Sequence, residues 1–487
     1  MTCDFPQLRP VLAPMGARSV DATLKPLRHA TLSQIETRLR PLLPAGCLDN
    51  QAAKDHSRDR LLPLDRTFWC WLWQILQCNT SCREVMKQVN LLFALHGRSM
   101  DENSSAYCQS RKLILPGLVQ RIYLHVAQAA FRWAPEATGL QGRRLKALDG
   151  TSARLADTPA NQAACPQPQS QNPGAGFPVM KIVALFCVAS GAIVGHATGN
   201  LWTSELSLAA QLLNALAAGD VLIVDRGFCN YALAALLSTL HVDVIVRVPT
   251  TIRHIDFRKS KKRLGSKDAL FVWKKSQRPC RWMALDQWLG LPETLTVRIL
   301  QVRIHSAGSR VQTVTLMTTL LDPTLYPAKE IAEAYRLRWR EEMCFDDLKT
   351  TLHMAHLKCL SPQMVQKEVS MFLIAHNLLR CLMAQAAAQA QINLEQISFK
   401  GTLDGFRHCS VALAQAKSKP VRIAVWEAFM AGLAADRLPT RPDRIEPRAV
   451  KRIIKYPKLT THRRLYKDRM SRNERRRHAT KRRAALN

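Results

Sequence analysis

The spacing of hydrophobic residues along the chain changes character near residue 145. Before that point, apolar residues recur at helical spacing, with a short stretch over 32–43 and longer ones over 68–77, 81–95 and 113–132. Such spacing gives each helix one apolar side that packs against its neighbours. The pattern predicts a helical N-terminal region, which we place at residues 1–140.

After residue 145, the apolar runs become short and are bounded by Gly, Ser and Asp, as is typical of buried strands. The runs are 145–148, 179–188, 192–198 and 221–224, with residues 204–218 spaced as an amphipathic helix between the last two. The second and third runs flank Ser190-Gly191 and predict a hairpin. The order strand, hairpin, helix, strand indicates an α/β fold.

Residues 249–320 alternate between apolar and polar positions, for example along Val297-Arg298-Ile299 and Val314-Thr315-Leu316. This period of two predicts a β-rich segment. Residues 321–438 return to helical spacing. Beyond them, residues 439–487 are rich in Arg, Lys and Pro, which predicts a basic, disordered tail.

Two aspartates close apolar runs in this pattern. Asp149 follows Leu145-Lys146-Ala147-Leu148, and Asp225 follows Val221-Leu222-Ile223-Val224. Each is followed by glycine, directly or after one residue, which permits a tight exit from a strand. An aspartate at such a place can be a turn former and nothing more. The alternative is that the two acids end neighbouring strands and act together.

A third acid belongs to the segment Tyr335-Arg336-Leu337-Arg338-Trp339-Arg340-Glu341-Glu342, which continues to Lys349 and has the spacing Y-x2-R-x3-E-x6-K. On a regular helix Tyr335, Arg338, Glu342 and Lys349 share an arc of roughly 60°. A solvated helix with ordinary ion pairs would also explain this face. With two strand-end aspartates, however, the glutamate completes a set of three carboxylates.

Three converging carboxylates do not all stay ionised without a compensating cation. Their hard oxygen atoms suit Mg²⁺ or Mn²⁺. The sequence therefore predicts a divalent metal site held by Asp149, Asp225 and Glu342. Arg338 and Lys349 beside it would attract a polyanionic backbone.

The motifs Asp149-Gly150-Thr151, Asp157-Thr158-Pro159, Gly176-Phe177-Pro178, Val224-Asp225-Arg226-Gly227-Phe228, Tyr335 to Lys349 and His376-Asn377-Leu378-Leu379-Arg380 occur in this order. In this combination the chain resembles the bacterial insertion-sequence DDE transposases of the insertion sequence four type. The matching motifs extend from about residue 70 to 380. One small departure is Ala160, where members commonly carry an acid.

The resemblance implies an RNase H-like catalytic core with a β-rich insertion between the second and third catalytic acids, and a helical N-terminal domain. We expect the core in residues 141–248 and 321–438 and the insertion in residues 249–320. The separation of 117 residues (342 − 225) leaves room for that insertion. Residues 1–140 would contribute to contacts with DNA ends, or would form a plain helical bundle.

The implied chemistry is cleavage at the ends of an insertion sequence, followed by attack of the freed 3′-hydroxyl on target DNA. Two Mg²⁺ ions per active site, for which Mn²⁺ may substitute, would be held about 3.5–4 Å apart. Arg338 would clamp a phosphate, Lys349 would act as a point charge, and Tyr335 would hydrogen-bond a backbone oxygen.

The charge balance agrees with a nucleic-acid partner. Lys plus Arg number 70 against 37 for Asp plus Glu, a net charge of +33. In the insertion we assign DNA contact to a basic run that lacks balancing acids, namely Lys259, Lys261, Lys262 and Arg263, although a solvated hairpin is the alternative. The expected partner is double-stranded DNA, both transposon ends and target, bound by a homodimer.

We expect a bacterial cytoplasmic, nucleoid-associated protein without a membrane segment. The start of the chain lacks the basic and apolar parts of a signal peptide. Lys181 and His196 interrupt the apolar stretch 179–197, which favours a buried hairpin. The 14 cysteines show no paired Cys-x2-Cys spacing, which argues against a zinc ribbon.

Several other interpretations stay open. An RNase H-like nuclease would hydrolyse without joining, a non-catalytic derivative would only bind DNA, and a basic packing protein would ignore terminal sequences. A recombinase with Tyr335 as nucleophile would leave the aspartates without a role. Trp273, Trp282 and Trp288 suit either stacking on an unpaired base or an ordinary core.

Overall fold

The computed structural model describes residues 38–49, 62–94, 102–132, 139–172, 174–249, 255–304, 312–416 and 418–438. The basic tail expected at 439–487 and most of the helical stretch expected at 32–43 lie outside these residues. The chain divides into two compact units, one of residues 1–133 and 371–439 and one of residues 134–370 and 440–487. They are described separately.

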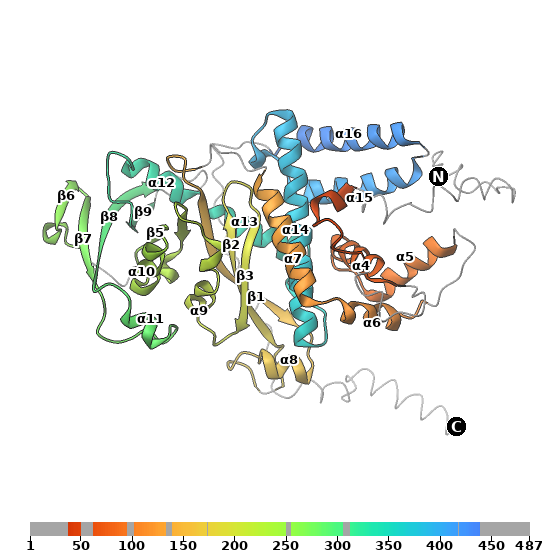
Figure 1. The fold of residues 1–487 in the computed structure, drawn as a ribbon, viewed down its shortest axis with the longest axis horizontal. Helices are drawn as coiled ribbons and strands as arrows, with labels where there is room; N and C mark the ends of the chain where they lie inside the picture. Colours follow the sequence, from red (N-terminus) through yellow and green to blue (C-terminus); the bar gives the residue numbers. More distant parts are fainter. Residues whose placement is uncertain are drawn as a thin grey trace, which may run out of the picture. The chain divides into compact units, whose positions relative to one another are not determined.

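The first unit is helical (Figure 1). Its N-terminal helices are η2 (Arg40–Leu42), α4 (Leu64–Leu76), α5 (Cys82–Ala94), α6 (Ser105–Leu113) and α7 (Pro116–Arg132). Its C-terminal helices are the later part of α14 (Pro362–Ala390), η8 (Leu394–Gln396), α15 (Phe399–Gln415) and α16 (Lys419–Ala435). The helices expected at 68–77, 81–95 and 113–132 are thus confirmed, with bounds shifted by a few residues.

The second unit is built on one ten-stranded sheet, with the strand order β3-β2-β1-β4-β5-β9-β8-β7-β6 and β10 beside β1 (Figure 1). The strands are β1 (Leu145–Leu155), β2 (Val179–Cys187), β3 (Ile193–Asn200), β4 (Val221–Val224), β5 (Asp243–Arg247), β6 (Lys262–Gly265), β7 (Asp268–Lys274), β8 (Thr294–Ile304), β9 (Gln312–Thr318) and β10 (His356–Leu357). Strands β1, β4 and β5 run parallel, and β2 and β3 form the expected antiparallel hairpin. The result is a mixed α/β fold.

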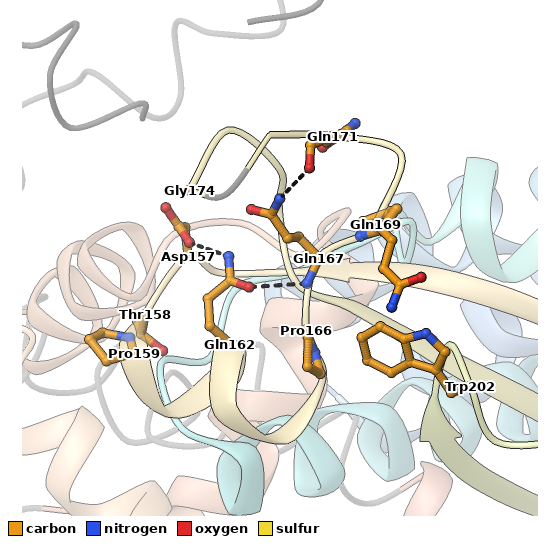
Figure 2. A pocket seen from close by; sticks show the side chains of 11 residues that line it. Asp157, Thr158, Pro159, Gln162, Pro166, Gln167, Gln169, Gln171, Gly174 and Trp202 are labelled. Carbon is orange, nitrogen blue, oxygen red and sulfur yellow. Dashed lines mark hydrogen bonds between the residues drawn. The ribbon is translucent and has the colours of Figure 1, made fainter. Parts of the chain in front are cut away.

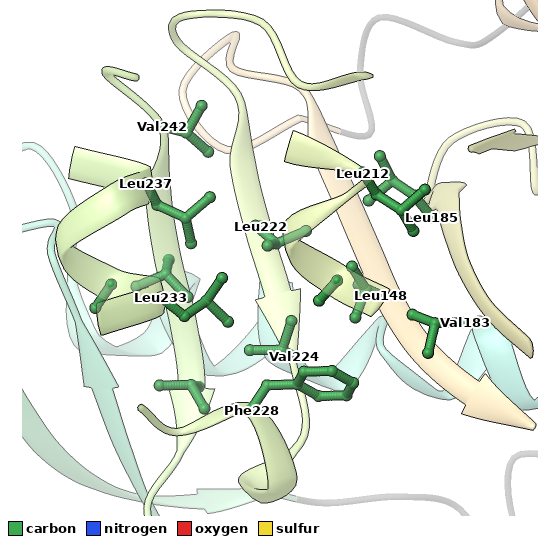
Figure 3. Packing of buried hydrophobic residues seen from close by; sticks show 14 of the residues in the cluster. Leu148, Val183, Leu185, Leu212, Leu222, Val224, Phe228, Leu233, Leu237 and Val242 are labelled. Carbon is green, nitrogen blue, oxygen red and sulfur yellow. The ribbon is translucent and has the colours of Figure 1, made fainter. Parts of the chain in front are cut away.

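Helices cover both faces of this sheet. They are α8 (Pro159–Ala164), α9 (Glu205–Ala210), η4 (Leu213–Ala215), η5 (Arg226–Phe228), α10 (Tyr231–Thr239), η6 (Phe257–Lys259), α11 (Leu285–Leu289), α12 (Ala328–Arg336), α13 (Trp339–Asp346) and η7 (Asp347–Thr351). On one face, Leu222 and Val224 pack with Leu233 and Leu237 of α10 (Figure 3). The opposite face is covered by α12.

The parallel strands alternate strictly between these two faces. Leu148, Leu222 and Val224 belong to the core under α9 and α10. Ala147, Val221 and Ile223 belong to the core under α12. This alternation follows from the period of two along a strand. It fixes the face to which every following side chain is directed.

A buried ion pair lies where the parallel strands β1 and β4 begin. Lys146 donates to Asp220 at 2.8 Å and to the carbonyl oxygen of Ala215 at 2.7 Å. The single helix expected over 204–218 is wrong, since α9 ends at Ala210 and the short η4 follows it. No helix continues past η4, because Ala215 O accepts from Lys146 and Ala217 N donates to Asp220 Oδ2 at 2.8 Å.

Two further differences concern the strands. β1 continues six residues past Asp149, because β2 remains paired with it as far as Arg154↔Val179. The segment expected as a β-rich insertion does contain strands, but they extend the same sheet, since β9 pairs antiparallel with β5. The insertion is therefore continuous with the central sheet.

One helix in the described part of the chain, α14, is long and apolar enough to cross a membrane by length and composition alone. Within this helix, 83% of the apolar stretch is buried inside the structure. Helices in the cores of soluble proteins pass the same test.

Candidate functional site

Asp149 and Asp225 lie side by side on one face of the sheet. Leu148 is the partner of Val224 in the parallel pair β1–β4, so the next residues of both strands are these two aspartates. The backbone of Asp225 stays extended, with φ −77° and ψ 169°. Each aspartate comes two residues after a residue whose side chain lies under α12, Ala147 for Asp149 and Ile223 for Asp225. Residues two apart on a strand point to the same face. The structure therefore directs the two acids to the face that α12 covers.

The segment from Tyr335 to Lys349 lies over this same face, but it is not the regular helix that the spacing suggested. α12 ends at Arg336, α13 begins at Trp339, and η7 after it is a π-helix. Between α12 and α13, Arg338 N bonds to Tyr335 O and Glu341 N bonds to Arg338 O, both at 3.0 Å. These are i→i−3 bonds, which wind the chain more tightly than an α-helix.

The tighter winding decides which of the two adjacent glutamates lies on the same face as Arg338. At about 120° per residue, three steps from Arg338 complete a full turn and bring Glu341 onto the face of Arg338. Arg338 Nη1 bonds to Glu341 Oε1 at 2.7 Å, and its Nη2 bonds to Glu342 Oε1 at 3.1 Å. The side chain of Glu341 is fully buried, whereas that of Glu342 is 45% exposed.

The electrostatics confirm that these groups are neighbours. Burial raises the pKa of Asp149 to about 6, the positive charge of Arg338 opposes that rise, and Asp225 adds to it. The pKa of Glu341 lies well above its ordinary value because of burial and then of the charge of Asp149. For Arg338, burial alone would lower the pKa, but Glu341 and Tyr335 raise it. The site is a cluster of carboxylates around one guanidinium.

Tyr335 and Lys349 flank this cluster. Tyr335 is 6% exposed within the core under α12, and burial raises the pKa of its phenol to about 12, with Arg338 opposing and Asp225 adding to the rise. Lys349 donates from Nζ to Thr151 Oγ1 at 3.1 Å. Thr151 lies two residues past Asp149 on β1 and so shares its face. All four motif residues therefore meet at one end of the parallel strands.

The basic residues of the insertion lie elsewhere. Lys259, Lys261, Lys262 and Arg263 are exposed, and the last two are on β6, at the far edge of the sheet. Six steps between neighbouring strands separate β6 from β1, which is roughly 30 Å. The structure does not bring these four residues together with the acids. Lysines on an edge strand also protect it from pairing with other chains.

The three tryptophans of the insertion pack around α10. Trp288 is 3% exposed, and Trp273 and Trp282 are partly buried against the same cluster. Trp273 meets Tyr231 edge to face, with ring centres 5.5 Å apart. Their packing is that of an ordinary core.

A pocket of about 640 Å³ lies at the loop between β1 and β2, with Trp202 on one side (Figure 2). Its wall is held by side-chain amides: Gln162 Nε2 bonds to Asp157 Oδ1 at 2.9 Å, and Gln167 N bonds to Gln162 Oε1 at 3.1 Å. Gly176 packs so closely that an added Cβ would lie 2.3 Å from Gln171 Oε1. The motif residues around Asp157 thus have a clear role in shaping this loop.

The same loop is tied to the segment that follows η7. Asn161 Nδ2 donates to the carbonyl oxygens of Ala156 and Cys359, at 3.0 and 3.1 Å. Thr158 Oγ1 accepts from Asn161 N at 3.2 Å and caps α8. Asn161 therefore joins the end of β1 to the chain beyond the third acid.

The donor set fits a divalent metal, since Asp149, Asp225, Glu341 and Glu342 offer only carboxylate oxygens. Among the described residues, no three His, Cys, Asp or Glu side chains approach closely enough to form a complete metal-binding group. In the same part of the chain, Glu341 Oε2 and Arg338 Nε are buried without hydrogen-bond partners. A buried carboxylate oxygen near Asp149 without a hydrogen-bond partner is suited to bind a cation.

Two residues of this site were not identified from the sequence. The spacing of the motif selects Glu342 and does not mark Glu341. Glu205, at the start of α9, lies against Gly150, where an added Cβ would be 3.0 Å from its carboxyl group, and its charge also raises the pKa of Asp149. For Glu341, the sequence offers one indication, its position directly before Glu342. Nothing in the local sequence marks Glu205.

Comparisons with known proteins identify a family and several similar proteins. A family model described as transposase DDE domain matches residues 140–378. The transposase InsG for insertion sequence element IS4 of Escherichia coli (strain K12) is 27% identical over 433 residues, covering 88% of this chain and 93% of that protein. The transposase for insertion sequence element IS421 of Escherichia coli is 32% identical over 78 residues, 16% of this chain and 20% of that protein. A piggyBac transposase from a synaptic complex with hairpin DNA aligns over 85% of both chains, with 9% identity and a TM-score of 0.39.

Proposed function

Because the chain belongs to the DDE transposases and is a DNA transposase of the IS4 type, we propose that Asp149, Asp225 and Glu342 are its catalytic acids. The observation that supports this proposal is that the three acids lie over the same face of the sheet. Asp149 and Asp225 end a parallel strand pair side by side, and the segment with Glu342 packs over them through Arg338. DDE transposases act on DNA with divalent metal ions. Here we infer two Mg²⁺ ions per site, with Mn²⁺ as a substitute.

The remaining motif residues handle the DNA backbone. When bound, the divalent ions supply Lewis-acid activation of a nucleophile and of a leaving 3′-oxygen. Within the described residues, the buried Nε of Arg338 has no partner, and Arg338 exchanges its contact with Glu342 for a phosphate when DNA enters. Lys349 adds a point charge beside Thr151. Tyr335 donates a hydrogen bond to a backbone oxygen.

The burial of Tyr335 weighs against the alternative in which it is a recombinase nucleophile. Its phenol is 6% exposed, and its pKa is raised to about 12. A nucleophile needs the opposite, a lowered pKa. The role of hydrogen-bond donor suits a phenol that stays protonated.

The finer architecture belongs to the same proposal. An RNase H-like core in residues 141–248 and 321–438 is supported by the order β3-β2-β1-β4-β5, in which an antiparallel hairpin precedes parallel strands. The strands β6 to β9 support an insertion at 249–320, and α4 to α7 support a helical region within 1–140. The compact units group residues 371–439 with those helices, so the proposed core crosses their boundary.

The partners follow from the charge and the reaction. We infer that Lys259, Lys261, Lys262 and Arg263 contact DNA away from the acids, because they are exposed. Two element ends must be joined in one reaction, which favours a homodimer bound to both transposon ends and then to target DNA. A nucleoid-associated location in the bacterial cytoplasm is the natural setting for this substrate.

The test uses a labelled duplex carrying the end of the element, Mg²⁺ and a target plasmid. The parent protein should cleave the end and join it to the target. The Glu342→Gln variant should retain DNA binding and lose at least about 10³-fold in rate, because its carboxylate no longer serves the ions. Glu333→Gln is the matched control, since Glu333 is exposed on α12 and forms an ion pair with Arg336 at 2.9 Å.

Two outcomes would change the conclusion. Hydrolysis of the end without any joined product would favour the RNase H-like nuclease. Equal activity of the parent and Glu342→Gln would remove Glu342 from the catalytic set, while loss of activity in Glu333→Gln would show that the assay reports folding.

A further inference from the structure

We propose that Glu341 is a further metal ligand of this site, a buried carboxylate that the Y-x2-R-x3-E-x6-K spacing does not assign. The inference rests on the proposed acid site and adds a residue to it. Glu341 would face the divalent cation together with Asp149, while Glu342 approaches from the solvent side.

The position of Glu341 on α13 is one that normally takes an apolar residue. Glu341, Cys344, Phe345 and Leu348 recur at i, i+3, i+4 and i+7, and all four are buried, with Glu341 1% exposed. A leucine there would pack without desolvating a charge. A carboxylate in an apolar stripe therefore calls for a partner of opposite charge.

The partner found in the structure satisfies only half of this carboxylate. Glu341 Oε1 accepts from Arg338 at 2.7 Å, and Oε2 is buried without any hydrogen-bond partner in the described part of the chain. Buried carboxylate oxygens are nearly always bonded, since an unpaired one is costly in free energy. The second oxygen is thus free to take a metal ion while the first stays on Arg338.

The packing of α13 places Glu341 over the sheet face that carries Asp149 and Asp225. Phe345, one turn after Glu341, meets Phe186 of β2 edge to face, with ring centres 5.0 Å apart. Phe186 pairs with Ala147, two residues before Asp149 and on the same face of β1. The stripe of α13 that carries Glu341 therefore covers the face from which Asp149 projects.

The charge balance of the site also favours a bound cation. Asp149, Asp225, Glu341 and Glu342 gather around Arg338, while Lys349 donates to Thr151. Four carboxyl groups beside one guanidinium leave an excess of negative charge if they are ionised. Divalent cations with oxygen coordination compensate such an excess.

The experiment measures Mn²⁺ binding to the full chain by electron paramagnetic resonance, alone and with an uncleavable end duplex. Glu341→Gln removes the charge at nearly constant shape, and Glu341→Leu completes the apolar stripe. Both should weaken Mn²⁺ affinity by about tenfold or more. Thermal unfolding of Glu341→Leu checks that this variant still folds, because Arg338 loses one of its two carboxylate partners. The exposed Glu333→Gln should bind Mn²⁺ as the parent does.

The outcomes separate this inference from the proposed acid site. If Glu341→Leu folds and binds Mn²⁺ with the affinity of the parent, Glu341 only positions Arg338 and the inference is wrong. If Asp149→Asn and Glu342→Gln also leave Mn²⁺ binding unchanged, the acid site itself is wrong. A parent protein that binds no Mn²⁺ in either condition overturns both.

Discussion

His376 lies fully buried on α14, where its ring stacks on Phe399 with ring centres 5.1 Å apart. Burial, with the nearby charge of Arg380, lowers the pKa of the imidazole to about 3. Its Nδ1 lies 3.3 Å from Asn377 Oδ1, and in the described residues its Nε2 has no partner. At this scale, a titratable side chain is held neutral by the helix that buries it.

This burial makes stability depend on pH with a definite sign. The folded pKa lies below the unfolded value of about 6.5, so between these values the unfolded chain binds more protons. Stability is therefore full above pH 6.5 and is lost on acidification, by up to about 1.4 kcal/mol per pH unit from this residue. Denaturant unfolding of the parent and of His376→Gln between pH 7.5 and about 5 tests this.

The control for this experiment is another histidine of the same helical unit. His408 is exposed on α15, so His408→Gln should keep the pH dependence of the parent. If His376→Gln loses stability with acid as steeply as the parent does, the titration belongs to another group.

The two glutamates at 341 and 342 show how far a single residue depends on its neighbours. They are chemically identical and adjacent, yet one side chain is fully buried and the other is 45% exposed. The i→i−3 bonds before α13 decide which of the two is buried, because they rotate the residues of α13 relative to those of a regular helix. A motif counts residues, and it cannot register such a change of winding.

At the scale of elements, α13 places the third acid, and aromatic packing holds α13. Phe345 is 6% exposed and contacts Phe186 of β2. Arg340 Nη1 donates to Val188 O at 3.0 Å, just beyond the end of β2. The helix is therefore attached to the hairpin at two points, one on either side of Glu342 along the chain.

Removing the aromatic contact should loosen the site. We expect Phe345→Ala to lower the free energy of unfolding by about 3–5 kcal/mol and to reduce end cleavage at a temperature where the protein is still folded. Met343 is the control on the same helix, since it is 62% exposed and Met343→Ala should change little. Thermal unfolding and cleavage of the labelled duplex measure the two effects. Unchanged cleavage by a folded Phe345→Ala would mean that α13 is positioned by other contacts.

At the scale of the whole molecule, charge is distributed unevenly relative to the site. The chain carries a net charge of +33, while the carboxylates of the site gather where the pairing of β1 with β4 ends. The basic residues of β6 lie at the edge of the sheet, roughly 30 Å away from β1. On our proposal, these basic residues contact DNA at a distance from the acids, in addition to Arg338 and Lys349 beside them.

This separation predicts that affinity and cleavage respond to different substitutions. Replacing Lys259, Lys261, Lys262 and Arg263 by Gln should flatten the dependence of log K on log salt by up to about 3.6, since each phosphate contact contributes about 0.9. Cleavage at saturating DNA should be preserved. Glu342→Gln is the control and should keep the slope of the parent. An unchanged slope in the fourfold variant would remove these residues from the DNA surface.

Local periodicity and turn residues were enough to predict the α/β class, the hairpin, the helices α4, α5 and α7 and the position of Asp225 at the end of β4. The resemblance of its motifs determined the transposase family. Only the tertiary structure decided the length of β1, the break at Leu337-Arg338 and the burial of Glu341. These depend on pairing with β2 and on packing against Phe186, contacts between segments that are distant along the chain and leave no periodic trace in it.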